Sequence, residues 1–166
     1  MLIPGDATLK KRNWKTYAFW MILSLGTGLL SGWLTREGTA RFSESAVQPP
    51  LSPPAILFPI VWTVLYLLMG ISAARVSLMP PSQDRSQGLN LFIVQLIVNF
   101  FWSPLFFNAE AYGFALLWLL LLWGLVLAMI LSFRKTDLIA ALLQIPYLLW
   151  LTFAAYLNAG VWLLNQ

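Results

Sequence analysis

Long apolar runs alternate with short polar segments along the 166 residues of this chain. A helix needs about 20 apolar residues to cross the hydrocarbon core of a bilayer, and several runs reach that length. No formal charge falls at the middle of a run. The pattern predicts an all-α polytopic membrane protein in which residues 1–166 form a single domain. We expect a five-transmembrane-helix bundle, with helices at about 17–35, 55–79, 89–108, 112–133 and 138–164.

The polar segments predict two substantial loops, an external one over about 36–54 and an internal one over 79–88, with tight hairpins elsewhere. Pro53 and Pro54 stand where the second helix is expected to begin, a position that tolerates proline because the first amides of a helix are unpaired. Pro59 falls further inside, where we expect a lost hydrogen bond and a kink. Two interpretations stay open, a rigid helix start and a shaped rim of a ligand pocket.

Composition places the chain in a membrane and suggests its orientation. Hydrophobic residues make up 60% and charged residues 10%, whereas roughly a quarter of residues are charged in soluble domains. The positive-inside rule puts the N-terminus in the cytoplasm and the C-terminus outside, and we expect a bacterial cytoplasmic membrane. The same basic clusters are attributed to orientation, so no nucleic-acid partner is expected. The predicted cytoplasmic side carries eight basic residues and the opposite side two. The eight are Lys10, Lys11, Arg12, Lys15, Arg75, Arg85, Arg134 and Lys135, and the two are Arg36 and Arg41.

Missing residue types exclude much of the usual site chemistry. The chain has no cysteine and no histidine, which removes disulfides, thiol nucleophiles, imidazole bases, zinc sites and ordinary haem ligation. We therefore expect no metal site and no required cofactor. The absence of a charge at mid-membrane also weakens the class of ion-coupled transporters. Any catalysis would depend on tryptophan, tyrosine, amide or hydroxyl side chains.

Three of the predicted helices carry a stripe of aromatic and polar residues at helical spacing. An unpaired amide in hydrocarbon costs several kcal/mol, so the amides are expected to face the bundle interior. They could act only as hydrogen-bonded packing contacts, or they could join the tryptophans around a flat, mostly apolar ligand. The stripes are Phe58, Trp62, Tyr66 and Met69, then Gln95, Asn99, Trp102, Ser103 and Phe106, and then Trp150, Ala154, Leu157 and Asn158.

Three segments, "QPPLSPPAILFPIVWTVLYLLMGISA", "QLIVNFFWSPLFF" and "PYLLWLTFAAYLN", carry a family resemblance. Together they are similar to the translocator protein family, also called the tryptophan-rich sensory protein or peripheral-type benzodiazepine receptor family. The resemblance covers most of the chain in the same order. It implies a homodimer of five-helix bundles with a pocket under the first external loop. In the family this pocket binds porphyrins such as protoporphyrin IX, benzodiazepine-type ligands and, in animals, cholesterol.

The resemblance also assigns residues to that pocket. Some bacterial members promote light-dependent porphyrin breakdown, and Trp62 and Trp150 match the tryptophans implicated, so they are the candidate catalytic pair. Phe42 matches an aromatic residue of the loop that covers the pocket. The residues implied to bind ligand are Phe42, Pro53, Phe58, Trp62, Tyr66, Asn99, Trp102, Phe106, Trp150, Ala154, Leu157 and Asn158.

Several positions depart from the family pattern. The usual Lys-Pro-x-Trp reads Gln48-Pro49-Pro50-Leu51, which loses a cation that could pair with a porphyrin propionate. Arg36 and Arg41 are candidates for that role or are simply solvated loop charges. Nothing basic follows Lys135, so the cholesterol-recognition pattern at the end of the fifth helix is absent.

The sequence thus predicts a receptor or sensor-like membrane protein that binds tetrapyrroles and similar flat hydrophobic ligands, with slow light-dependent porphyrin degradation as a variant. Its expected partners are a hydrophobic small molecule, membrane lipid and a second copy of the chain. A transporter or lipid-handling protein is one alternative. A structural or assembly subunit without a ligand is the other, and its aromatic faces would be filled by neighbouring helices.

Overall fold

The computed structural model describes residues 5–166, with side chains from residue 13 onward. Every regular element in that part of the chain is helical, and five helices are long and apolar enough to span a membrane. The predicted all-α membrane fold is confirmed. In chain order the elements are α1 (Gly5–Leu34), α2 (Arg36–Ser45), α3 (Leu57–Leu78), α4 (Gln83–Ser103), the π-helical turn η1 (Pro104–Asn108), α5 (Tyr112–Thr136), α6 (Leu138–Leu142) and α7 (Ile145–Leu164).

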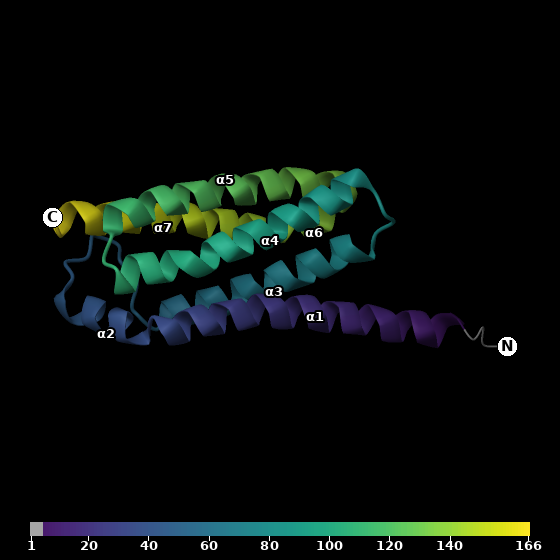
Figure 1. The fold of residues 1–166 in the computed structure, drawn as a ribbon, viewed down its shortest axis with the longest axis horizontal. Coiled ribbons are helices and arrows are strands. Elements are labelled where there is room, and N and C mark those ends of the chain that lie inside the picture. Colours follow the sequence, from purple (N-terminus) through teal and green to yellow (C-terminus); the bar gives the residue numbers. More distant parts are fainter. Residues whose placement is uncertain (1–4) are drawn as a thin grey trace.

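The long helices run side by side along the longest axis of the molecule (Figure 1). The chain leaves α1 into the short helix α2, which lies at the same end as the C-terminus. Residues 79–82 and Asp137 make their turns at the opposite end, where α1 begins. We call these the lid end and the basic end. The lid itself is α2 together with residues 46–56.

Two predicted boundaries are wrong. The segment 36–54 is not simply a loop, because α2 occupies its first half. The internal loop ends at Gln83, since the Ser82 hydroxyl accepts a hydrogen bond from the Arg85 amide at 3.1 Å and caps α4 there. The fifth predicted span keeps its bounds of 138–164, and a break at residues 143–144 divides it into α6 and α7.

The expectation for Pro59 is also wrong. Helix α3 begins at Leu57, so Pro59 stands in the first turn, where the amides have no partner within the helix in any case. No helical hydrogen bond is lost, and the reason for a kink disappears. The Leu57 amide instead donates to the Pro54 carbonyl at 2.9 Å, which closes the turn that leads into the helix.

Helices α1 and α3 pack closely because glycines let them approach. A Cβ atom added at Gly70 would lie 2.6 Å from the Cα of Met21, so the two backbones are nearly in contact. Gly28 lies directly against the ring of Tyr66. Gly28 of α1 and Gly70 of α3 thus allow a close helix contact within the chain, as small residues do between membrane helices.

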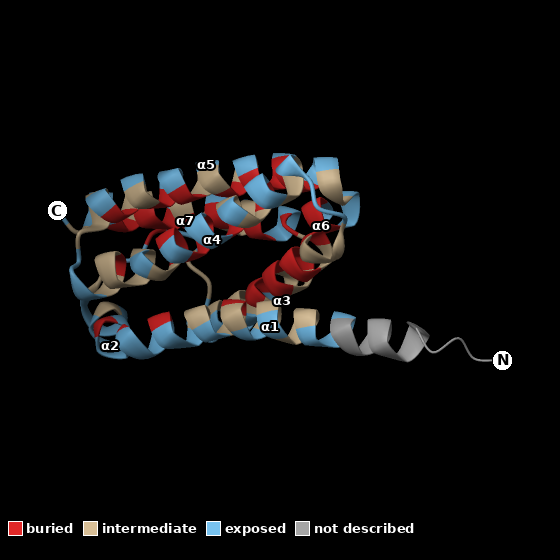
Figure 2. Cartoon of the chain, turned by 45° about the vertical axis from the view of Figure 1, so that its right-hand side comes forward, coloured by how far each residue is buried: buried red, intermediate tan, exposed pale blue. Residues whose placement is uncertain are grey.

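Burial follows the bundle, with buried residues facing its interior and exposed residues facing out (Figure 2). Met69, Phe92 and Phe133 are fully buried, whereas large apolar residues such as Leu117 and Leu149 are 65% exposed. An apolar surface of this kind suits hydrocarbon, where association is driven by packing rather than by exclusion of water. The outward-facing helix surfaces therefore match an integral membrane protein.

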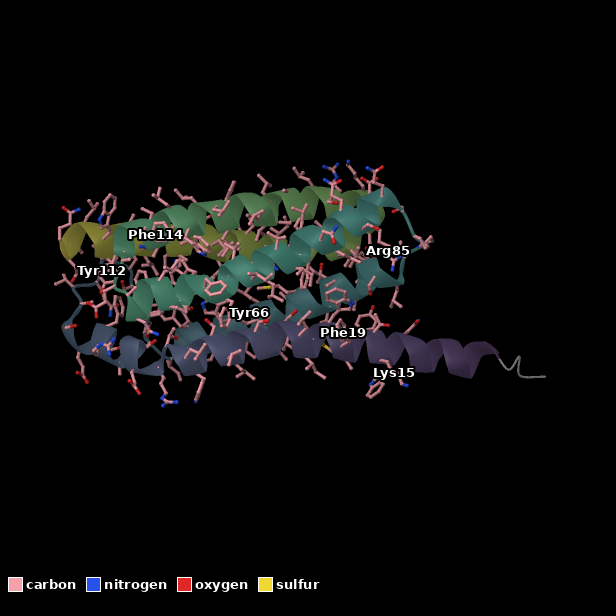
Figure 3. The ribbon with its side chains drawn as sticks, in the orientation of Figure 1. Lys15, Phe19, Tyr66, Arg85, Tyr112 and Phe114 are labelled. Atoms are coloured by element: carbon pink, nitrogen blue, oxygen red, sulfur yellow. The ribbon has the colours of Figure 1, made fainter. Side chains whose placement is uncertain are left out.

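Charged side chains lie at the two ends of the bundle. Lys15 and Arg85 lie toward the basic end, and Tyr112 lies toward the lid end (Figure 3). At the basic end, Asp137 accepts hydrogen bonds from the first amides of α6 and pairs with Arg75 at 2.9 Å. The side chains of the predicted basic residues Lys10, Lys11 and Arg12 lie outside the described residues.

Candidate functional site

A cavity of about 510 Å³ lies beneath the lid, between α1, α3, α4 and α7. The helical spacing of each sequence stripe turns most of its members toward this one space, whereas Met69 and Gln95 lie outside the lining. The structure brings every predicted ligand-binding residue to the cavity wall. They are Phe42, Pro53, Phe58, Trp62, Tyr66, Asn99, Trp102, Phe106, Trp150, Ala154, Leu157 and Asn158.

Aromatic rings form two walls of the cavity. On one side Trp62 packs against Tyr66 with ring centroids 5.5 Å apart, and Phe58 meets Trp150 edge-on at 5.9 Å. The indole N–H of Trp150 is buried without a hydrogen-bond partner among the described residues, so its ring carbons rather than its donor form the wall. The two predicted catalytic tryptophans thus line the same space.

On the other side Trp102 stacks on Phe106 at 5.1 Å with an interplanar angle of 25°. Asn158 fixes the Trp102 indole, since its Oδ1 accepts from the Trp102 N–H at 3.4 Å and its Nδ2 donates to the Tyr112 carbonyl at 2.8 Å. Asn158 is 1% exposed. Its amide therefore ties α7 to α4 and to the start of α5.

A chain of buried polar side chains runs inward from the cavity. The Tyr66 hydroxyl donates to Asn99 Oδ1 at 2.6 Å, Asn99 Nδ2 donates to the Tyr147 hydroxyl at 2.6 Å, and that hydroxyl donates to Gln95 Oε1 at 3.1 Å. We call these four residues the amide–tyrosine chain. Only Tyr66 and Asn99 reach the cavity, while Tyr147 and Gln95 lie behind them with 0% exposure. The predicted inward orientation of the amides is confirmed.

The lid is fastened to the far end of α7. The Asn165 side chain bonds both backbone groups of Val47, accepting from its amide and donating to its carbonyl at 2.9 Å each. The Tyr156 hydroxyl donates to the Pro50 carbonyl at 2.8 Å. Within the lid, Leu51 takes a left-handed conformation with φ of 67° in a turn closed by a bond from the Ser52 amide to the Pro49 carbonyl.

Phe42 holds the helical part of the lid over the cavity. Its ring centroid is 5.3 Å from that of Phe106 and 5.4 Å from that of Phe107. Gly38, one turn earlier, is so close to Phe107 and Asn108 that a Cβ atom would not fit. The lid thus packs onto η1, where Phe106 and Phe107 both turn toward it.

The formal charges of the lid end stay outside the cavity. The Arg36 guanidinium lies 3.7 Å from the Glu37 carboxylate, and that of Arg41 lies 3.8 Å from Glu110. All four side chains are more than half exposed. Neither arginine lines the cavity, which agrees with the interpretation of both as solvated loop charges.

Sequence reasoning missed the contribution of α1. Its outer half lines the cavity through small and apolar residues, and only its glycine spacing gave any signal. Tyr147 was also missed as a partner of Asn99, because a contact between helices leaves no trace in the spacing along one helix. The α1 residues in the lining are Leu25, Gly28, Leu29, Ser31, Gly32 and Trp33.

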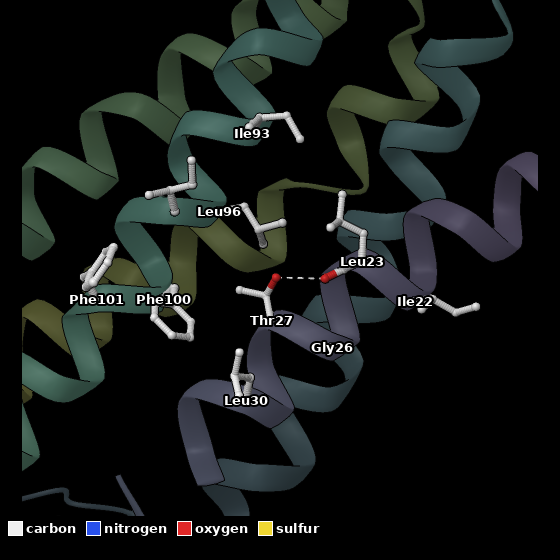
Figure 4. Close-up of a pocket in the computed structure, with 10 residues that line it drawn as sticks. Ile22, Leu23, Gly26, Thr27, Leu30, Ile93, Leu96, Phe100 and Phe101 are labelled. Carbon is white, nitrogen blue, oxygen red and sulfur yellow. Dashed lines mark hydrogen bonds between the residues drawn. The ribbon is translucent and has the colours of Figure 1, made fainter. Parts of the chain in front are cut away.

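A second hollow, of about 500 Å³, lies on the outside of the bundle between α1 and α4 (Figure 4). Leu23, Leu30 and Ile93 are among its side chains, and the Thr27 hydroxyl is bonded to the Leu23 carbonyl at 2.8 Å. It contains none of the predicted site residues. This hollow is an apolar groove, and its chemistry matches that of the lipid-facing surface.

Comparison with known proteins agrees with this architecture. The TspO/MBR family matches residues 19–163. Protein CrtK of Rhodobacter capsulatus is 41% identical over 123 residues, which cover 74% of this chain and 77% of that protein. The tryptophan-rich protein TspO of Chlorobaculum tepidum is 34% identical over 151 residues, or 90% of this chain and 96% of that protein.

A mammalian protein is also similar over most of this chain. The translocator protein of Bos taurus is 36% identical over 150 residues, covering 89% of this chain and 88% of that protein. The family match covers most or all of each of the five spanning helices and both walls of the cavity. On these grounds the chain belongs to the TspO/MBR family of membrane proteins.

Proposed function

We propose that this protein is a membrane receptor or sensor-like protein that binds tetrapyrroles and similar flat hydrophobic molecules in the cavity beneath its lid. The observation that carries the proposal is the meeting of Trp62, Trp102 and Trp150 around one space of about 510 Å³. Small-molecule pockets are usually about 300 to 1,000 Å³, apolar and aromatic, with few polar groups. Relatives named as sensory and translocator proteins are consistent with a binding role.

Quenching of tryptophan fluorescence tests the proposal. Protoporphyrin IX titrated into the detergent-solubilised protein should quench emission saturably, because a bound porphyrin would lie against the indole rings. The double variant Trp62→Phe with Trp150→Phe should lose most of this saturable quenching. Trp14→Phe is the control, since Trp14 is 69% exposed and lies outside the cavity lining. Equal quenching in all three proteins would remove these tryptophans from the site.

Light-dependent porphyrin breakdown is the catalytic variant of this proposal. It is supported by the position of Trp62 and Trp150 on the same cavity, where either indole could exchange an electron with an excited porphyrin. Illumination of the complex in air should then give a new absorption product that requires the native tryptophans. No product beyond that of free porphyrin in the same light would end the catalytic variant and leave binding intact.

The alternatives have less support. A structural subunit would use its aromatic faces for packing, whereas these faces surround open space. Ion-coupled transport is disfavoured because the described part of the chain places no formal charge in the cavity lining.

The homodimer remains a proposal from the family resemblance, and light scattering on the detergent-solubilised protein would measure its mass.

A further inference from the structure

We propose that the cavity takes the electrically neutral members of this ligand class, such as porphyrin esters, in preference to porphyrins that carry two ionised propionates. This inference rests on the proposed function and specifies its ligand. It follows from the absence of charge in the cavity lining, from the state of the nearby arginines and from the pairing of the cavity's own polar groups.

The lining offers no countercharge. Among the described residues that form it there is no Asp, Glu, Lys or Arg. Moving a carboxylate out of water without a partner costs several kcal/mol. A dianionic porphyrin must therefore keep both carboxylates in water at the mouth, and this restricts how deeply it can enter. A neutral ester has no such restriction.

The two arginines of the lid end are already engaged. Arg36 lies 5.2 Å from the centre of the Trp33 ring and also near Glu37, and Arg41 faces Glu110. A propionate that approached either guanidinium would compete with the neighbouring carboxylate. Exchange of one carboxylate for another brings little gain at an exposed site, where ion pairs contribute about 0 to 1 kcal/mol.

Several hydrogen-bond donors of the cavity are also occupied, although the indoles of Trp62 and Trp150 and the amide of Gln48 bond no described residue. Tyr66 and Asn99 are bonded within the amide–tyrosine chain, and Asn158 is bonded at both ends of its amide. A carboxylate that entered would lose its water and find no free donor among these groups. Most serine and threonine hydroxyls of the lining likewise donate to backbone carbonyls. The donors are Ser31, Thr35, Ser43, Ser52 and Thr63.

Gln48 is the position at which this selectivity can be changed. It lies on the lid, is exposed and contributes to the lining, and its amide bonds no described residue. Lysine fits such an exposed position and would bring an unpaired cation to the mouth of the cavity. Gln48→Lys should therefore favour the dianionic ligand. Gln87→Lys is the matched control, because Gln87 is equally classed as exposed but belongs to α4 at the basic end.

The experiment compares protoporphyrin IX with its dimethyl ester at neutral pH, by quenching in one uncharged detergent. N-acetyltryptophanamide in the same detergent serves as the blank, because Trp102 still lines the cavity in the double tryptophan variant. In the native protein the ester should bind at least about tenfold more tightly than the acid, which corresponds to about 1.4 kcal/mol. Gln48→Lys should reduce the ratio of the two dissociation constants at least about threefold, and Gln87→Lys should leave it unchanged. Comparing the ratio between variants cancels the partition of each ligand into micelles, and the ratio for the native protein is corrected by the measured partition of each ligand.

The outcomes separate the two proposals. Equal or tighter binding of the acid by the native protein would overturn the inference while leaving the proposed function standing. The same change of ratio in Gln48→Lys and Gln87→Lys would also overturn it, since the cation would then act only through net charge. Quenching by neither ligand above the blank would refute the proposed function and, with it, the inference.

Discussion

Tyr147 holds two buried amides in fixed orientations. Its hydroxyl accepts from Asn99 Nδ2 and donates to Gln95 Oε1, which leaves Asn99 Oδ1 to receive the Tyr66 hydroxyl. The direction of each bond in the amide–tyrosine chain is thus set by its neighbour. The inward orientation of the two amides was predictable from the cost of an unpaired amide in hydrocarbon. The role of Tyr147 was not, because it depends on how α7 packs against α4.

Removal of the Tyr147 hydroxyl tests this arrangement. Tyr147→Phe leaves a buried donor on Asn99 and a buried acceptor on Gln95 without partners, and we expect a loss of about 1 to 3 kcal/mol of stability. The measurement is thermal unfolding in detergent. Tyr17→Phe is the control, because the Tyr17 hydroxyl bonds no described residue and its loss should be nearly neutral. Equal unfolding temperatures for the two variants would contradict the prediction.

At the scale of elements, the apolar runs located the five spanning helices to within a few residues at most ends. The exceptions have physical causes. Helix α2 is short and polar, so it gives no apolar run, and α4 begins early because Ser82 caps it within a polar segment. The break between α6 and α7 falls at Gln144 inside an apolar run, where mean hydropathy gives no signal, although Pro146 stands in the first turn of α7, a position that tolerates proline.

The contact between α1 and α3 predicts different outcomes for two glycines. Gly70→Ala places a methyl group against the Met21 backbone, which cannot move aside like a side chain, and should cost about 1 to 3 kcal/mol. Gly124→Ala is the control, because a Cβ atom there has no neighbour within 4 Å. It should be neutral or stabilising, since alanine favours the helix. Thermal unfolding in detergent measures both, and equal losses would argue against the close contact.

The fastening of the lid can be tested by proteolysis. Asn165→Ala removes both bonds to Val47, so the lid should open more often and trypsin should cleave after Arg41 several-fold faster. Asn90→Ala, an exposed change in α4 near the basic end, should leave the rate unchanged. Cleavage at the native rate in Asn165→Ala would show that the Val47 bonds do not hold the lid.

At the scale of the whole molecule, the distribution of charge suggests how the bundle lies in the bilayer. Arg75, Arg85, Arg134 and Lys135 are at the basic end, and Arg36 and Arg41 are at the lid end. The positive-inside rule then puts the basic end in the cytoplasm and the cavity mouth outside. This orientation stays a prediction. The position of the charges at the two ends of the bundle was predictable, because charges are confined to the ends of the apolar runs. The cavity volume was not, because it depends on how the helices diverge.

Labelling of single cysteines tests the orientation, and the chain is suited to it because it contains no native cysteine. Ser45→Cys, exposed at the end of α2, should react with a membrane-impermeant maleimide in intact cells. Gln87→Cys, exposed at the basic end, should react only after the cells are permeabilised. The opposite pattern would reverse the assigned orientation.

The π-helical turn η1 makes the lid contact sensitive to chain length. A π turn accommodates one residue more than an α-helical turn, and here it lets Phe106 and Phe107 both meet Phe42. Deletion of a single residue within Pro104–Asn108 could be absorbed as ordinary α-helix, yet it would rotate one aromatic away by about 100°. Length variation at this one turn would therefore alter how the entrance closes, even where Phe106 and Phe107 are both retained.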